Sequence, residues 1–546
     1  MQERDKVMSQ LLKNHKLNYE EGEKHRKNAQ RTIDSAIKYA APTLETIDEA
    51  SLEFYNKESK ERVAGIWDTT LINAFEEYID TMKSRMFPST SKWFKIEINP
   101  LIERELSEED KKDVQTIERL TWHCMSISNF QFILDIILKD YNISTALTRV
   151  AYTGNKSNPL VYESFPFGSF ILGTPRPDGK IKEVYVERKK LSKMDVENIF
   201  PMVRFCNSDE EEENPDCLVN GLEEYNLIEF VTTSNTFMET KNGHQAEWFE
   251  YYVVDSEFTK VLYTEILPYN PFVVSRIAPT NDGSRYGKGR LVGIIPTFAT
   301  LNQITESETR AIVWDSNPAK AVILGGMSGS KLDATKVVFE AGKATALPQD
   351  SQVIDIKSGL DINATRVKIQ DYRRLIFDAL AVRPMGSFED TKYKTAQEMY
   401  QREKENERIL TSRYATTINQ VSAPLVETTM SVLEYHDIFN FPKNFDAYII
   451  KYVNPVTQNQ KVDEVQKIIA VITLLRTIYG VNIPNVIMND EEVLSAIIDS
   501  IDVDRDLLLP EDEIKARIDQ ILMNMQQAQA EQQVAEGGQQ WILKTI

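Results

Sequence analysis

Apolar residues near the start of the chain recur at the three- and four-residue spacing of an amphipathic helix. In NAFEEYIDTMKSRMF the recurring positions are Phe75, Tyr78, Ile79, Met82 and Met86. The segment FQFILDIILKDY at 130–141 is apolar enough for a helix that is buried on one face or on most of its surface. We therefore predict that the chain is helical up to about residue 150.

The spacing of apolar residues changes between about 151 and 290, where stretches typical of strands appear. KIKEVYVERK alternates around Ile181, Val184 and Val186, and WFEYYVVDSEFTKVLYTEIL is rich in β-branched and aromatic residues. Turn signals such as RPDGK at 176–180 separate these stretches. The acidic run SDEEEENPD at 208–216 is typical of a solvated loop. This zone is therefore predicted to be a β region.

Helical spacing returns from about residue 291 and is interrupted once. The segments 290–314 and 363–380 each predict a helix of roughly 30 Å, with Pro296 marking a start or a kink. Between them, 315–360 is typical of a small insert of strands and loops. The two helices would hold this insert away from the rest of the protein.

The second of these helices is followed by AVRPMGSFEDTKYK at 381–394, which has no helical period. Thr395 and Glu398 form a T-x-x-E capping box, which predicts the start of a new helix. That helix runs to about residue 435, and Pro424 inside it predicts a kink. The chain is thus expected to pass from a helix through an irregular loop into a long bent helix.

Composition and charge narrow the class of protein. A length of 546 residues predicts two to four subdomains, and 42% hydrophobic with 27% charged residues is ordinary for a soluble globular protein. A formal charge of −20 argues against a protein that grips nucleic acid through a basic surface, although nucleic acid could still slide past it. Cys124, Cys206 and Cys217 are too few and too scattered for a disulfide framework or a zinc site, so a reducing compartment is expected.

Segments that would direct the chain to or through a membrane are not evident. The start, MQERDKVMSQ, has no apolar region of the kind found in signal peptides. The most apolar run, IIAVITLL at 468–475, is far shorter than a membrane span. We therefore expect a soluble protein that is cytoplasmic where it is made.

Patterns that would support catalysis or cofactor binding are missing from the sequence. None of the five histidines pairs with another at metal-ligand spacing. YGKGR at 286–290 lacks the glycine spacing and the Ser or Thr of a phosphate-binding loop, so a turn into a helix is the simpler interpretation. The run at 502–513 places four acids at positions of a calcium loop, but Leu507 stands where that loop needs glycine. We predict no metal, no cofactor and no enzymatic activity.

Several segments of the chain occur in an order that is typical of one family. IWDTTLINAFEEYIDTMKSRMFPSTSKWFKI contains a W-D-[ST] helix start and a closing Trp-Phe pair, and YNPFVVSRIAPTNDGSRYGKGRLVGIIPTFATLNQ carries the strongest resemblance. Taken in order, these segments resemble the head-to-tail connector, or portal protein, of short-tailed, podovirus-type bacteriophages. The resemblance covers about 60–525 and departs from the family at 143–145, where Ile-Ser-Thr replaces a turn that usually contains glycine. The positions that carry it include Trp67, Asp68, Trp93, Arg276, Tyr286, Gly287, Gly289, Asn302 and Pro424.

The resemblance implies an α+β, mainly helical portal fold that assembles into a ring, expected to hold twelve copies, around a central channel. The implied regions are a wing at 1–290, a first stem helix at 291–314, a clip at 315–360, a second stem helix at 361–380, a tunnel loop at 381–394, a long kinked helix with a return to the wing at 395–455, and a crown with a C-terminal tail at 456–546. Such a ring lies at one capsid vertex of the virion, and double-stranded DNA passes through it during packaging and ejection.

The resemblance also implies the partners. They are further copies of the chain, double-stranded DNA, the major capsid protein, the large subunit of the terminase motor, a tail adaptor or nozzle protein, and possible scaffold or internal core proteins, with no membrane. Candidate tunnel-loop residues beside the DNA are Arg383, Met385, Phe388, Lys392 and Lys394. Ordinary solvated loop charge explains the lysines equally well, and packing between subunits explains the two apolar residues equally well.

The helix after the loop contains QREKENER at 401–408, which has no apolar side chain. A helix that is polar all round needs charge pairs or polar neighbours. Pairs at i, i+3 or i, i+4 within this stretch would supply some of that stabilisation. In a ring the same surface becomes a candidate seam between subunits, formed by Arg402, Glu403, Lys404, Glu405, Glu407 and Arg408.

Two other classes of protein stay open at this point. One is a non-channel structural protein, such as a tail adaptor or a minor capsid protein. The other is a metal-dependent enzyme of an assembly machine, which would need a carboxylate cluster or a phosphate loop. Neither alternative requires a helix, an insert, a second helix, a loop and a kinked helix in that order.

Overall fold

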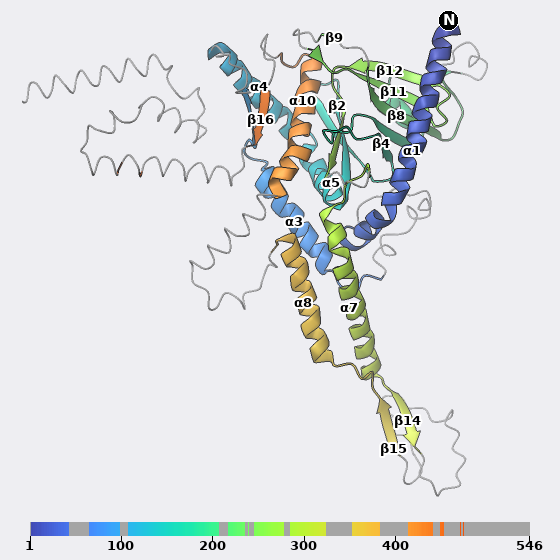
Figure 1. Cartoon of the computed structure of the whole chain (residues 1–546), viewed down its shortest axis with the longest axis vertical. Coiled ribbons are helices and arrows are strands. Elements are labelled where there is room, and N and C mark those ends of the chain that lie inside the picture. The colour runs from blue at the N-terminus through green and yellow to red at the C-terminus, as the bar shows by residue number, and fades with distance from the viewer. Residues whose placement is uncertain are drawn as a thin grey trace, which may run out of the picture. The chain divides into compact units, whose positions relative to one another are not determined.

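The architecture is described from a computed structural model (Figure 1). The structure describes residues 2–42, 65–98, 108–206, 217–234, 238–239, 245–277, 284–323, 352–382, 413–440, 448–452, 470 and 473. The chain divides into two units, Met1–Tyr452 and Val453–Ile546. Only two described residues belong to the second unit, so the fold below is that of the first.

Helices form where apolar residues recur at helical spacing. All five apolar positions predicted for the segment around Phe75 are buried along one helix, which confirms that prediction. The described α-helices of the first unit are α1 (Gln2–Ala40), α3 (Thr70–Met86), α4 (Glu108–Ile127), α5 (Phe130–Ile143), α6 (Lys193–Ile199), α7 (Ile295–Ser316), α8 (Ile362–Leu380) and α10 (Ala423–Tyr435). A short 3-10 helix, η2 (Arg290–Gly293), precedes α7.

Two antiparallel sheets make up the β region, as the alternating pattern predicts. The larger sheet has the strand order β12-β11-β8-β5-β4, and the smaller has the order β13-β2-β3. Their strands are β2 (Thr145–Tyr152), β3 (Leu160–Phe165), β4 (Phe170–Leu172), β5 (Val184–Leu191), β8 (Tyr225–Thr233), β11 (Phe249–Asp255), β12 (Val261–Leu267) and β13 (Phe272–Arg276). The predicted turn at 176–180 is confirmed by Gly179, which has a φ of 80°. A two-residue pair, β9 (Met238–Glu239) with β10 (Gln245–Ala246), adds a short hairpin.

The core lies where α5 packs against the smaller sheet and α3 packs against α5. Trp93 is 2% exposed and stacks on Phe130 with ring centroids 6.1 Å apart. Phe87 meets the same indole edge-on at 4.9 Å. The resemblance placed Trp93 at the end of the first helix, and the structure makes it the centre of an aromatic cluster. Its role is therefore to close the core rather than to bind a ligand.

Helix α1 runs along the larger sheet (Figure 1) and covers a second, smaller cluster of buried side chains around Tyr185 and Phe230. Polar contacts fix the helix there as well. Tyr19 donates to Glu187 at 2.5 Å, and Arg285 donates to Glu21 at 2.9 Å. The N-terminal helix is thus an integral part of the body.

A buried ionic cluster joins the two sheets. Glu229 of β8 is 0% exposed and accepts hydrogen bonds from Arg188 of β5 at 2.8 Å and from Tyr251 of β11 at 2.7 Å. Arg149 of the smaller sheet lies 3.2 Å from the same carboxylate, and Arg188 also makes two bonds to Glu163. Burial alone would raise the pKa of Glu229, but the two guanidiniums and the phenol outweigh it and hold the pKa below its ordinary value.

Two strands lie in zones that the periodicity predicts to be helical, and there the prediction is wrong. β1 (Phe94–Ile98) pairs antiparallel with β16 (Tyr448–Tyr452), with Phe94 opposite Tyr452. Each strand is only five residues long, and its partner lies more than 350 positions away in the sequence. A strand this short is stabilised by its distant partner. The local sequence pattern therefore does not predict it.

The cysteine prediction is also wrong for one pair. Cys206 and Cys217 form a disulfide with Cα atoms 5.9 Å apart. They belong to β6 (Arg204–Cys206) and β7 (Cys217–Val219), which pair in parallel and bring the two sulfurs together. Their spacing in the sequence does not reveal this pairing. The cysteine count therefore no longer supports a reducing compartment. The acidic run between them lies outside the described residues.

The expected break near Pro424 is present. The described helix from residue 413 widens to a π-helical turn over Ile418–Ser422, and α10 then starts with Pro424 in its first turn. Proline has no N–H to donate to the preceding turn, and a π turn is one way for a helix to accommodate that loss. The part of the predicted long helix before residue 413, including its capping box, lies outside the described residues.

Candidate functional site

The segment that sets this protein apart is a helical hairpin, made of α7, the strands β14 (Ala319–Ile323) and β15 (Gln352–Ile356), and α8. It projects from the body of the first unit, with the two strands at its far end (Figure 1). α7 starts at Ile295 with Pro296 in its first turn, as predicted. Both predicted helices and the described part of the predicted insert are therefore confirmed.

The two helices pack against each other in antiparallel directions. Leu301 and Ala311 of α7 and Ile369 and Ile376 of α8 are buried. Arg366 donates to Glu308 between the two helices at 3.1 Å. One narrow face of each helix is thus used within the hairpin, and the opposite face is left in solvent.

Side chains also fix the far end of the hairpin. Trp314 donates its indole N–H to the carbonyl of Ile356 at 2.8 Å. Asp315 accepts from the backbone N–H and the hydroxyl of Ser358 at 2.7 and 2.9 Å. Asp361 caps α8 by accepting from two backbone N–H groups in the first turn. The strands themselves stay open, because every residue of β15 is exposed.

The near end of the hairpin is held by what we call the root cluster, which contains three residues of the sequence resemblance. The side-chain oxygen of Asn302 accepts from the backbone N–H groups of Trp67 and Asp68 at 2.6 and 3.2 Å. Its amide group donates to the carbonyl of Gly65 at 2.9 Å. Arg373 of α8 donates twice to the buried carboxylate of Asp68, at 2.8 and 3.1 Å. One short segment thus binds both hairpin helices to the start of α3.

The YGKGR segment forms the turn that leads into α7. A Cβ atom on Gly289 would lie 2.0 Å from the carbonyl oxygen of Ile143 at the end of α5, and one on Gly287 would lie 2.8 Å from two carbonyl oxygens. Tyr286 is 1% exposed and donates to the Phe170 carbonyl at 3.2 Å. Arg276 donates to the carbonyl of Arg285, just before this turn, and to the carbonyl of Gly179 in the turn at 176–180. These residues make a close-packed turn, in agreement with the simpler interpretation of the motif.

The end of α8 is tied to the point where the chain returns. Ala381 adopts a left-handed conformation with a φ of 57°, and Val382 donates back to the Phe377 carbonyl. Arg413 then donates to the last helical carbonyls, those of Ala379 and Leu380, at 2.9 and 2.7 Å. The 30 residues between Val382 and Arg413 therefore leave and re-enter the described structure at one place.

The sequence-predicted residues beyond this point lie outside the described residues. They are the tunnel-loop candidates Arg383, Met385, Phe388, Lys392 and Lys394 and the seam candidates Arg402, Glu403, Lys404, Glu405, Glu407 and Arg408. Sequence reasoning missed Arg373 and Arg413, which hold the hairpin. The seven-residue spacing of Arg366 and Arg373 along α8 is a signal that could have singled out Arg373.

Within the described ranges, no group of histidine, cysteine, aspartate and glutamate side chains could hold a metal ion. None of the helices described here is long and apolar enough to cross a membrane. What the geometry does offer is mechanical: a projecting hairpin whose two ends are both held by hydrogen bonds.

The described geometry is that of an α+β body with a projecting helical hairpin. Over residues 13–508 the chain matches the family of bacteriophage head to tail connecting proteins, and it belongs to that family. It therefore has the role of a phage portal or connector and is a component of the virion, with capsid and tail proteins as its partners in general. The family is structural and not enzymatic. No curated protein matches the chain closely enough to be named as a relative.

Proposed function

We propose that this connector forms a twelve-membered ring at one capsid vertex and that double-stranded DNA passes through its central channel during packaging and ejection. The observation that carries the proposal is the hairpin. Its helices of 22 and 19 residues are each about 30 Å long. Copies of such a hairpin, arranged in a circle, form the wall of a tube.

In this proposal each part of the chain has one place in the ring. Residues 1–290 form the wing, 291–314 and 361–380 the stem, 315–360 the clip and 381–394 the tunnel loop. Residues 395–455 form the long helix and its return to the wing, and 456–546 the crown and tail. The bond of Arg413 to the end of α8 supports a loop that starts and finishes at the inner end of the stem.

The charge of the chain supports passage of DNA rather than tight binding. Each subunit carries a formal charge of −20, so a ring of them repels a phosphate backbone over roughly a Debye length, about 10 Å at 0.1 M salt. Repulsion keeps the DNA from adhering to the wall. Basic residues in the tunnel loop, such as Arg383 and Lys392, would hold the duplex on the axis. No cofactor is needed for this function.

The open strands of the clip indicate where partners bind. β14 and β15 form a two-stranded sheet with exposed side chains and little core of its own, and such a sheet is marginally stable alone. We assign it to contacts with neighbouring subunits, with the large subunit of the terminase motor and later with the tail adaptor or nozzle. The wing would contact the major capsid protein, and the crown would contact any scaffold or internal core proteins.

Electron microscopy of the purified full-length protein tests the proposal. Rings of about twelve subunits with an open centre are expected, and incubation of particles with a terminase motor should place the motor at the hairpin tip. Monomers or closed particles under several assembly conditions would overturn the ring and favour a non-channel adaptor or minor capsid protein. Activity that depends on Mg²⁺ or a nucleotide would favour the enzyme alternative.

A further inference from the structure

The hairpin helices each carry an exposed ridge on the side away from their partner helix. Residues 308 and 369 face the partner helix. Because each residue turns an α-helix by 100°, the side chains two positions before, two positions after and five positions after these residues point away from the partner helix. On α7 these are Glu306, Arg310 and Val313, which we call the α7 ridge. On α8 they are Val367, Asp371 and Arg374, which we call the α8 ridge.

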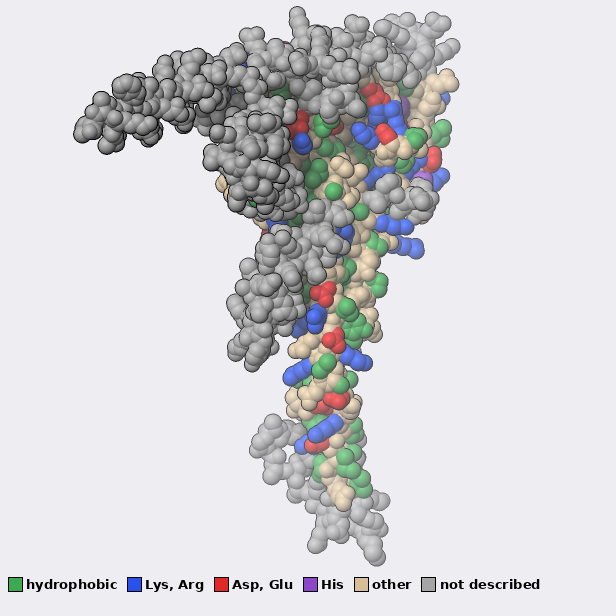
Figure 2. Space-filling view, turned by 60° about the vertical axis from the view of Figure 1, so that its left-hand side comes forward, with side chains coloured by type: hydrophobic (Ala, Val, Ile, Leu, Met, Phe, Trp, Pro, Cys, Tyr) green, Lys and Arg blue, Asp and Glu red, His purple; other side chains and the backbone are tan. Residues whose placement is uncertain are grey.

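Apolar residues on these ridges are unusually exposed. Val313 and Val367 are 65% and 57% exposed, and Trp314 and Leu375 beside them are 49% and 55% exposed. Figure 2 shows hydrophobic, basic and acidic side chains following one another along the surface of the hairpin. Large apolar side chains concentrated on one projecting element mark an interaction surface.

The charged residues of the two helices are almost all paired within the described structure. Glu306 pairs with Arg310, and Arg374 pairs with Asp378. The ion pairs of Arg366 and Arg373 and the bonds of Asp315 account for the rest. Only Lys368 and Asp371 have no hydrogen bond or ion pair to another described residue. Of these two, Asp371 belongs to a ridge.

The two ridges are complementary when one is read in reverse. The α8 ridge runs from an apolar residue to an acid and then a base. Read from Val313 back toward the start of α7, the α7 ridge runs from an apolar residue to a base and then an acid. Antiparallel contact therefore places Val367 against Val313, Asp371 against Arg310, and Arg374 against Glu306. The outer members of each set are seven positions apart in the sequence.

We propose that the α8 ridge of one copy packs against the α7 ridge of the next copy. This inference rests on the proposed ring and names the surface that closes it. Because the two ridges are different surfaces of one chain, the contact is heterologous, which is the type of interface that generates rings. Arg310 of the neighbour supplies the partner that Asp371 lacks among the described residues of its own chain.

The register of this contact also sets a geometric condition. Within one hairpin, Arg366 lies beside Glu308. In the proposed contact, α8 is aligned with the neighbour's α7 six or seven residues further along than with the α7 of its own hairpin. At 1.5 Å per residue this shift is about 10 Å. Neighbouring hairpins must therefore lean relative to the ring axis instead of standing parallel to it.

Charge reversal tests the contact. Asp371→Arg and Arg310→Asp each place like charges opposite one another, and each should raise the concentration for half-maximal ring assembly by about tenfold or more. Combining both substitutions in one chain should restore assembly. Mixing the two single variants should also restore it. In an alternating ring the two reversed ridges meet at every second contact, and two unchanged ridges meet at the contacts between. Ring formation is measured by native mass spectrometry and mass photometry, and circular dichroism checks that each variant is folded.

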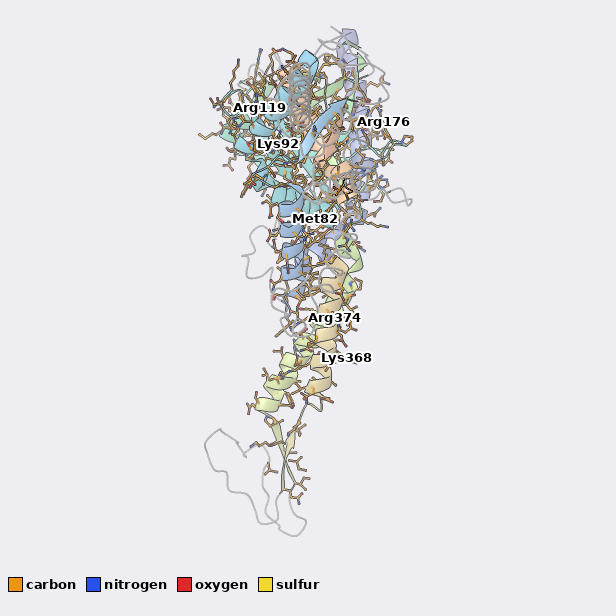
Figure 3. All side chains as sticks on the ribbon, turned by 90° about the vertical axis from the view of Figure 1, so that its left-hand side faces the viewer. Met82, Lys92, Arg119, Arg176, Lys368 and Arg374 are labelled. Carbon is orange, nitrogen blue, oxygen red and sulfur yellow. A yellow bond between two sulfur atoms is a disulfide. The ribbon has the colours of Figure 1, made fainter. Side chains whose placement is uncertain are left out.

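Lys368→Glu is the matched control, since Lys368 lies on the same helix and is equally unpaired but is off the ridge (Figure 3 labels it with Arg374). It should assemble like the wild type. Single variants that assemble normally, or a double variant that is no better than the single ones, would overturn the ridge contact while leaving the ring itself intact. Failure of the wild type to form any ring would instead refute the proposed function.

Discussion

The buried cluster around Glu229 yields the sharpest stability prediction. Replacing Glu229 by Gln keeps the size of the side chain and removes its charge. Arg149 and Arg188 then lose the carboxylate that lies 3.2 and 2.8 Å away, and Tyr251 loses a charged acceptor at 2.7 Å. The remaining acid, Glu163, has 39% of its side chain exposed and can offset only part of the two positive charges.

The expected loss follows from this geometry. Removing one member of a buried and hydrogen-bonded charge cluster costs about 3–5 kcal/mol, because the partners remain buried. Glu163→Gln is the matched control, since it removes the same charge from a site in contact with water. An exposed pair contributes about 0.2–1 kcal/mol. The two variants should therefore differ by several kcal/mol although the chemical change is identical.

The pH dependence adds a second measure. The folded-state pKa of Glu229 lies below its ordinary value of 4.5, because the guanidiniums outweigh burial. Its contribution to stability is therefore complete above pH 4.5 and is lost as the pH falls through the folded-state pKa. The gap in unfolding free energy between wild type and Glu229→Gln should be widest near neutral pH and should narrow in acid.

Urea unfolding of the full chain, followed by tryptophan fluorescence at several pH values, measures both effects. A Glu229→Gln variant that unfolds within about 1 kcal/mol of the wild type would refute the reasoning, since that is the scale of an exposed pair. Equal losses for Glu229→Gln and Glu163→Gln would refute it as well. So would a gap between wild type and Glu229→Gln that widens in acid.

Three further predictions concern the hairpin and the loop beyond it. Gly289→Ala should lower the free energy of unfolding by more than about 2 kcal/mol, because its Cβ would lie 2.0 Å from a carbonyl oxygen of α5. Gly293→Ala has open space and should stay within about 1 kcal/mol of wild type; equal thermal midpoints for the two would contradict the close packing. Arg373→Gln should speed protease cleavage of the hairpin several-fold, roughly in proportion to its local opening, since it weakens the bond to Asp68; unchanged cleavage would show that this bond does not hold α8. Deleting residues 385–391 should leave rings intact but reduce the DNA packaged or retained per particle, and normal DNA content would show the tunnel-loop assignment to be wrong.

Local patterns in the sequence predicted much of the fold. The helical spacing around Phe75 places five side chains on one face whatever lies beside them, and the structure buries all five. The position of Pro296 predicted the start of α7, and Pro424 predicted the break before α10. These features depend on periodicity and on proline geometry, which act within a few residues.

The candidate site was only partly predictable for the same reason. The resemblance singled out Trp67, Asp68 and Asn302 but not what they do. Their role depends on contacts between residues 235 positions apart and on Arg373, which no motif included. The two helices of the hairpin and the insert between them were predicted, whereas the hydrogen bonds that hold the hairpin to the body were not.

By itself the sequence determined much of the order of the elements and the faces that its helices bury, because period, turn residues and proline are local properties. The class of protein was indicated by the ordered motifs that resemble the connector family. Tertiary structure alone decided the pairing of β1 with β16, the disulfide between Cys206 and Cys217, and the bond that Arg413 makes to the end of α8. Each of these depends on groups that are distant in sequence and close in space. Such contacts depend on the packing that holds their elements side by side in the folded protein.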